Sequence, residues 1–128
     1  MKIESIYHRG VTSAAPDDRL RRCAEDMTGA GVSALPIVAE ERLLGIITEG
    51  DLVRAMARGA DFETATARAH MTPDAVTVSA EDDTADAALK MFELGVRHLP
   101  VAEAGRLVGM VSSRDLLVME AWPPVSPR

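Results

Sequence analysis

Two stretches decide the fold, GVSALPIVAEERLLGIITEGDL (residues 31–52) and GVRHLPVAEAGRLVGMVSSRDL (residues 95–116), because they are versions of one pattern. A shift of 64 residues superimposes them without a gap and matches the Gly-Val, Leu-Pro, Arg-Leu and Asp-Leu pairs. Across residues 11–54 and 75–118, twelve of the 44 positions are identical. A chain of 128 residues with two such halves is most simply a pseudo-symmetric pair of repeats.

Each half predicts the order strand, helix, strand, strand, helix. A short extended piece (residues 10–13 and 75–78) precedes a helix whose buried face recurs at i, i+3, i+4 and i+7. Gly31 and Gly95 suit a left-handed cap where that helix ends. Two apolar runs around a charged turn then predict paired strands, and residues 49–58 and 113–121 predict the closing helices.

The repeat also predicts the domain organisation. Residues 1–60 are expected to form repeat 1, residues 61–74 a linker, residues 75–121 repeat 2 and residues 122–128 a proline-rich tail. The stretch GADFETATARAH (residues 59–70) is small and polar. We therefore expect it to be a connector whose length lets the second half swing round and pack on the first.

Composition excludes several classes of function. The net charge is -6 with no basic stripe, so a nucleic acid is not an expected partner. No apolar run is long enough for a membrane span or a signal peptide, and the lone Cys23 cannot form an internal disulfide. We expect a cytoplasmic protein that has no contact with a membrane. Cys23 is on the buried face of the first helix, where we interpret it as a small hydrophobic residue.

Polar residues at the end of the last strand of each half are not explained by the apolar pattern. Thr48 and Asp51 are three residues apart, as are Ser112 and Asp115. One interpretation is a capping box, in which the hydroxyl and the carboxylate complete a helix start. The other is a ligand site, in which the helix start holds a phosphate and the aspartate accepts ribose hydroxyls. The residues alone leave both open, and the preceding glycines allow close backbone approach without deciding between them.

The ordered motifs resemble a known family. MTPDAVTV (residues 71–78), an apolar helix, G-V-x-x-L-P and G-x-x-[ST]-x-x-D occur in the order that is typical of the CBS domain, named after cystathionine beta-synthase. The duplication resembles a tandem CBS pair, or Bateman module, over about residues 2–121. The resemblance implies an α/β fold of the α+β type, with two pseudo-symmetric β-α-β-β-α repeats packed through their sheets. It also implies two clefts for adenosine-containing ligands such as AMP, ADP, ATP, S-adenosylmethionine or NAD.

Carried over by position, the resemblance assigns a candidate nucleotide site to each half. In the family the aspartate holds the ribose, the hydroxyl contacts ribose or phosphate, and apolar residues enclose the adenine. One cleft would use Thr12, Leu35, Pro36, Ile46, Thr48 and Asp51. The other would use Thr77, Leu99, Pro100, Met110, Ser112 and Asp115.

The two halves differ where a phosphate would bind. Arg97 and His98 precede the second Leu-Pro pair, and Arg114 lies in the second helix start, where the first half has Glu49 and Gly50. An arginine fork suits a phosphate. We therefore predict unequal clefts, with phosphate-rich ligands near the basic residues. The alternatives are a solvated surface charge for Arg97 and a partly buried strand residue for His98.

The resemblance implies a regulatory module rather than an enzyme. No paired nucleophile and base is evident, and the three scattered histidines lack the spacing of a metal site. We expect no required cofactor, a nucleotide as ligand, an effector protein as partner and a homodimer formed through the second helices, with Trp122 beside Met119 as a contact. The alternative is a structural or interaction protein whose degenerate clefts bind nothing.

Overall fold

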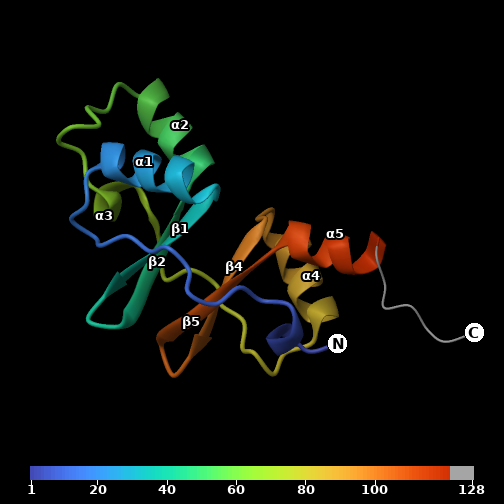
Figure 1. Cartoon of the computed structure of the whole chain (residues 1–128). Coiled ribbons are helices and arrows are strands. Elements are labelled where there is room, and N and C mark those ends of the chain that lie inside the picture. The colour runs from blue at the N-terminus through green and yellow to red at the C-terminus, as the bar shows by residue number, and fades with distance from the viewer. Residues whose placement is uncertain (122–128) are drawn as a thin grey trace, which may run out of the picture. The chain divides into compact units, whose positions relative to one another are not determined.

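A computed structural model describes the backbone of residues 1–121 and the side chains of residues 1–118. The described chain divides into two compact units, each named here for its two main helices (Figure 1). The unit of α1 (Leu20–Ala30) and α2 (Glu49–Ala57), the α1–α2 unit, comprises residues 11–75 and 104–107. The unit of α4 (Thr84–Leu94) and α5 (Ser113–Ala121), the α4–α5 unit, comprises residues 1–10, 76–103 and 108–121.

The α1–α2 unit is built on a strand hairpin. β1 (Ala34–Ala39) and β2 (Arg42–Thr48) pair in antiparallel fashion, and the two-residue β3 (Thr72–Pro73) also pairs with β2. Helices α1 and α2 contact these strands and each other, and the short α3 (Ala67–His70) contacts α2. The core between them is aliphatic and consists of Ala14, Leu20, Cys23, Met27, Leu35, Ile37, Ile47, Leu52, Ala55 and Ala67.

The α4–α5 unit repeats this plan. β4 (His98–Glu103) pairs with β5 (Arg106–Ser112), and α4 contacts both β4 and α5. A single 3-10 turn, η1 (Ile3–Ser5), adds a buried isoleucine near the start of α4 (Figure 1). The core consists of Ile3, Val78, Ala87, Met91, Leu99, Val101, Val111 and Leu116. Each unit therefore has a hydrophobic core of its own.

These elements confirm the predicted α+β fold and most of its boundaries. Both first helices end at a glycine with a left-handed φ of 67°, Gly31 in one unit and Gly95 in the other. Only a residue without a Cβ adopts this conformation at little cost. The closing helix of the first half ends at Ala57, one residue before the predicted end.

The predicted first strands are shorter than expected. Each is reduced to one parallel bridge, between Ala14 and Ile37 in one unit and between Val78 and Val101 in the other. In both units two backbone hydrogen bonds hold the bridge, and the acceptor for the first is a proline carbonyl, that of Pro36 or Pro100. The extended pieces are thus anchored at single residues rather than along a strand.

Residues 59–70, the predicted connector, pack against the start of α1. Arg19, the N-cap of α1, makes no side-chain capping bond. The N–H groups of Leu20 and Arg21 donate instead to the carbonyls of Ala65 and Phe62, at 2.9 and 3.1 Å. Unpaired N–H groups at a helix start need such acceptors, and small residues let the connector approach closely. The segment also contains α3 and the fully buried Ala67.

The first ten residues do for the α4–α5 unit what the connector does for the α1–α2 unit. With the 64-residue shift, Met1 corresponds to Ala65, and its carbonyl accepts from Thr84 N just as that of Ala65 accepts from Leu20 N. Likewise Ile3 N donates to Asp82 O, and Ala67 N donates to Asp18 O. The unit boundaries therefore differ from the expected division into residues 1–60 and 75–121, because each repeat's leading segment packs in the unit of the other repeat's helices.

Candidate functional site

The start of α2 brings together Thr48 and Asp51, as the sequence predicts. Thr48 is the N-cap, and its backbone N–H and its Oγ1 donate to Asp51 Oδ2 at 2.8 and 3.1 Å. In return, the N–H of Asp51 donates to Thr48 Oγ1 at 3.3 Å, which completes a capping box. The second carboxylate oxygen, Oδ1, accepts from Arg54 Nη2 at 2.7 Å. Both oxygens of this carboxylate are therefore engaged, although 13% of the side chain remains exposed.

The start of α5 has the same backbone geometry. Ser112 N donates to Asp115 Oδ2 at 2.8 Å, and Asp115 N donates to Ser112 Oγ at 3.2 Å. Here the partner of Oδ1 comes from a distant part of the chain, because His8 Nε2 lies 2.6 Å from it. The Asp115 side chain is also 13% exposed. The structure therefore contains the hydrogen bonds that the capping interpretation predicts for both hydroxyl and carboxylate pairs.

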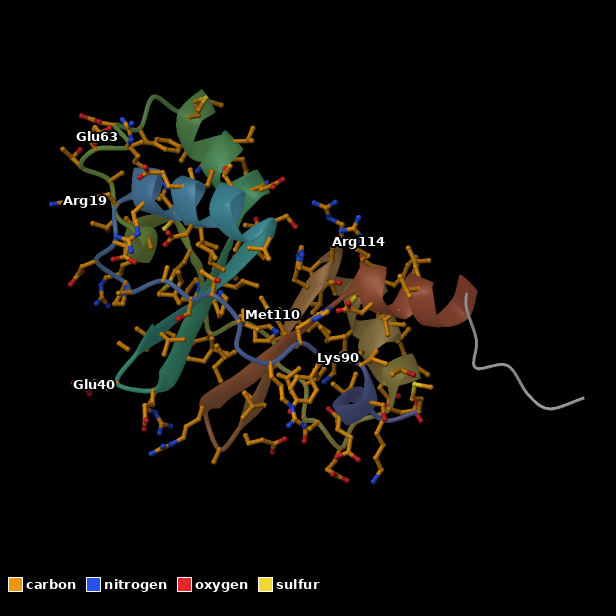
Figure 2. The ribbon with its side chains drawn as sticks, viewed as in Figure 1. Arg19, Glu40, Glu63, Lys90, Met110 and Arg114 are labelled. Carbon is orange, nitrogen blue, oxygen red and sulfur yellow. The ribbon has the colours of Figure 1, made fainter. Side chains whose placement is uncertain are left out.

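Backbone contacts place the residue before each Leu-Pro strand beside its helix start. Glu49 N donates to Ser33 O at 3.0 Å, and Ser113 N donates to Arg97 O at 2.9 Å. The residue that differs most between the halves, Arg97, therefore lies at the start of α5. Arg114 belongs to the first turn of the same helix, where Figure 2 shows its side chain extending away from the helix. Both arginines are exposed, and their side chains pair with no other described residue.

The two candidate phosphate-binding regions consequently differ in charge. At the start of α5 the residues are Arg97, Ser113 and Arg114, and at the start of α2 the equivalent residues are Ser33, Glu49 and Gly50. His98 begins β4 and is half-buried. The basic side of the predicted asymmetry is therefore gathered at one helix start.

The apolar candidate residues are almost completely buried. Leu35 and Leu99 are at most 1% exposed and belong to the cores of their units. Pro36 and Pro100 are also fully buried, and Ile46 and Met110, the latter labelled in Figure 2, are 8% and 7% exposed. Thr12 is exposed and Thr77 is half-buried, and in the 64-residue shift they are not equivalent, since Thr77 aligns with Ser13.

The glycines before the two hydroxyls make room for the chain itself. A Cβ on Gly45 would collide with the carbonyl oxygen of Thr72, and one on Gly109 would collide with the Tyr7 ring and the His8 carbonyl oxygen. The close approach that these glycines allow is therefore made by the two leading segments described above.

Among the described residues, no three His, Cys, Asp or Glu side chains are grouped closely enough to hold a metal ion. Burial raises the pKa of the Cys23 thiol to about 11, which agrees with its interpretation as a core residue. None of the helices in residues 1–121 has the length and apolar character that a membrane crossing requires.

A family model of the CBS domain matches this chain twice, over residues 3–58 and 67–119. The chain belongs to the CBS domain family. Hypoxic response protein 1 of Mycobacterium tuberculosis is 34% identical over 113 residues, which are 87% of this chain and 79% of that protein. Inosine-5'-monophosphate dehydrogenase of Korarchaeum cryptofilum is 29% identical over 123 residues, and this CBS pair covers 95% of itself but only 25% of that enzyme.

Two solved structures similar to this CBS pair contain adenosine compounds. The CBS domain protein PAE2072 from Pyrobaculum aerophilum, complexed with AMP, has a TM-score of 0.88 at 26% identity, and the match covers 94% of both chains. The CBS domain pair of protein MJ0100, in complex with 5-methylthioadenosine and S-adenosyl-L-methionine, has a TM-score of 0.87 at 25% identity. That match covers 94% of this chain and 99% of the other.

Sequence reasoning missed the partners of the two aspartates in this CBS pair. His8 is one of the three histidines to which the sequence analysis assigned no role, but the 64-residue shift aligns it with Thr72 of the MTP motif. This alignment does not decide which strand His8 joins. Arg54 had a simpler signal, because a residue three positions after Asp51 lies on the same helix face. The predicted dimer contact at Trp122, beside Met119, lies outside the residues whose side chains the structure describes.

Proposed function

We propose that this CBS pair is a regulatory module that binds adenosine-containing nucleotides and transmits the bound state to a partner or within a dimer. The observation that supports it most is the repeated helix start, in which a hydroxyl and a carboxylate follow a buried strand. Related CBS pairs with this fold hold AMP, S-adenosylmethionine and 5-methylthioadenosine. Exposed arginines beside a helix start favour a phosphate, and an aspartate suits a ribose diol. The residues that would bind are the fifteen named by position above.

The basic residues at α5 extend the proposal to ligand preference. We place the phosphate of a nucleotide near Arg97 and Arg114, where two exposed guanidinium groups can donate to its oxygens. The start of α2, with Glu49 in its first turn, would accept fewer negative charges. The α4–α5 half-site should therefore favour AMP, ADP or ATP, and the α1–α2 half-site should favour ligands such as S-adenosylmethionine.

The test is isothermal titration calorimetry with adenosine, AMP, ADP, ATP, S-adenosylmethionine and NAD. Asp51→Asn and Asp115→Asn are the decisive variants, because an amide oxygen can still cap the helix whereas its NH2 group cannot accept from a ribose. We expect Asp115→Asn to abolish AMP binding and Asp51→Asn to retain it. Replacement of Arg97 and Arg114 by alanine should weaken AMP binding without weakening adenosine binding.

The alternative function, a structural or interaction protein whose clefts bind nothing, is supported by the two complete capping boxes. If the hydroxyl and carboxylate pairs serve only as caps, no adenosine compound will bind to a protein that is folded, and the module is then an interaction protein. Wild-type protein that shows no heat with any of the six ligands would favour this alternative. Loss of stability in both aspartate variants, with no change in the binding of any ligand, would also favour the interaction protein.

Assembly with a second copy is the route we propose for transmission. Helices α4 and α5 border an apolar groove of about 470 Å³, and its lining residues Phe92 and Leu117 are 85% and 67% exposed. On α2, Val53 and Met56 are 66% and 69% exposed. Large exposed apolar side chains indicate an interaction surface, and a two-fold dimer would cover the same groove in both copies. Phe92→Glu should yield a monomer in sedimentation velocity if this groove is the interface.

A further inference from the structure

The strongest unassigned feature is the contact between His8 and Asp115, which occupies the carboxylate oxygen that the capping box leaves available. The imidazole Nε2 lies 2.6 Å from Oδ1, and the His8 side chain is 70% exposed. The backbone of His8 is fixed independently of this contact, since its N–H donates to Met110 O at 2.8 Å and its carbonyl accepts from Met110 N at 3.0 Å. The ring can therefore leave the carboxylate without releasing the segment.

The other half of the molecule shows that the repeat does not impose this contact. Thr72 is equivalent to His8 and pairs with Ile46, the equivalent of Met110. There Arg54, on the same helix as Asp51, binds the outer oxygen. The equivalent of Arg54 in α5 is Val118, which has no side-chain donor. His8 thus supplies the partner that α5 cannot provide.

We propose that His8 competes with ligand for Asp115 and so sets the affinity of the α4–α5 half-site for a ribose diol. This inference rests on the proposed function, in which that diol donates to the aspartate. Because the cap engages Oδ2 and only 13% of the Asp115 side chain is exposed, a diol that donates to Oδ1 competes with Nε2 for the accessible part of the carboxylate. The freed imidazole turns into solvent, to which it is already largely exposed. A ligand without a diol gains nothing from displacing it.

The first experiment measures AMP affinity by calorimetry in the wild type, His8→Ala and His8→Gln. Exposed ion pairs are weak, so His8→Ala should bind AMP about two- to fivefold more tightly. His8→Gln retains an N–H donor at a similar distance and should return affinity toward the wild-type value. With 2',3'-dideoxy-AMP, which lacks the diol, His8→Ala and wild type should bind equally.

Controls separate competition from a change in structure. Arg54→Ala, which removes the equivalent partner of Asp51, should not reproduce the gain from His8→Ala at the α4–α5 half-site. Unchanged or weaker AMP binding by His8→Ala would overturn the proposal. An equal gain with 2',3'-dideoxy-AMP would also overturn it, because the diol would then play no part.

A second measurement on ligand-free protein keeps this proposal separate from the proposed function. The 15N chemical shifts of the His8 imidazole, assigned by their loss in His8→Gln, should change in Asp115→Asn if the contact exists. Unchanged shifts would overturn the competition even if nucleotides bind. Absence of AMP binding by the wild type would overturn the proposed function and the competition together, whereas AMP binding that ignores His8 would overturn the competition alone.

Discussion

The α2 and α5 helix starts have the same backbone and the same cap, but their carboxylates are held in different ways. Asp51 is bound by Arg54, three residues along its own helix, and Asp115 is bound by His8, 107 residues away in sequence. A local partner moves with its helix, whereas a distant one links the helix start to the leading segment of the first repeat. Duplication therefore preserves the hydrogen-bonding frame, and substitutions at a few equivalent positions give the two halves different chemistry.

A similar contrast holds in the cores. In both units a leading segment adds one fully buried residue, Ala67 beside α1 and Ile3 beside α4. Ile3 is much larger than Ala67, whereas on the first helix of each half the order is reversed, since Cys23 is larger than its equivalent Ala87. The two cores thus use side chains of different size at equivalent positions.

The largest expected effect comes from Leu35→Ala and Leu99→Ala, which test whether the two cores are equivalent. Both leucines are at most 1% exposed, so each substitution leaves a cavity and should cost about 2–5 kcal/mol of unfolding free energy without any ligand present. Urea denaturation of each variant gives this value. Because the family resemblance assigns both leucines to nucleotide clefts, this result would assign them to the core first.

Leu35→Met and Leu99→Met are the controls, since they nearly conserve volume and should cost less than about 1.5 kcal/mol. An alanine variant with wild-type stability and weaker AMP binding would contradict the core assignment at that position. Costs that differ strongly between the two positions would show that one core tolerates collapse better than the other.

A smaller effect is expected from Gly45→Ala and Gly109→Ala, which test the docking of the two leading segments. In both cases the added methyl would collide with a backbone carbonyl oxygen, of Thr72 or of His8. We expect each to lose about 1–3 kcal/mol. Hydrogen exchange should show lost protection of residues 71–74 in the first variant and of residues 3–8 in the second.

Gly29→Ala provides the matched control, because this glycine lies within α1 and a Cβ there would meet no atom within 4 Å. Alanine favours a helix, so this variant should be at least as stable as the wild type. Unchanged hydrogen exchange in residues 3–8 of Gly109→Ala would contradict the docking role of Gly109. Gly45 and Gly109 would then have different roles in their two units.

How much the sequence could predict depends on whether a feature is local. The left-handed caps at Gly31 and Gly95 and the capping residues Thr48 and Asp51 follow from neighbours in the chain, and the structure shows them where they were expected. The contact of His8 with Asp115 depends on which unit the first ten residues join. The hydrophobic pattern of one repeat does not determine this choice, since either unit offers a similar strand and glycine.

The sequence motif alone also did not predict that the apolar candidate residues are buried. Leu35 is equally compatible with a cleft wall and with a core, because both environments favour an aliphatic side chain. Packing decides between them, and packing depends on α1 and the connector together. The packing of the connector against α1 was not predicted, because Ala65 and Ala67 have little hydrophobic surface. Their small side chains suit them for packing, because they let the backbone reach the start of α1.

The smallest expected effect distinguishes the starts of α1 and α4, where Arg19 and Asp83 are the equivalent N-caps. Asp83 Oδ1 accepts from Ala85 N at 2.9 Å, and this bond lowers the pKa of the Asp83 carboxyl below its usual value. Because the pKa of the Asp83 carboxyl is lower in the folded protein than in the unfolded chain, the cap contributes stability above the usual aspartate pKa. This contribution is lost as the pH falls through the folded pKa. The α1 start, held by the carbonyls of Ala65 and Phe62, has no such titration.

NMR titration from pH 6 downward follows both helix starts in one sample. The amide signal of Ala85 should move with a midpoint below that of an ordinary aspartate, while the amides of Leu20 and Arg21 should not follow that midpoint. Asp83→Asn keeps an acceptor but cannot titrate, so the Ala85 transition should vanish without melting α4. A shared transition in α1 and α4 would mean that acid acts on both units together, and the difference in their caps would then have no consequence for stability.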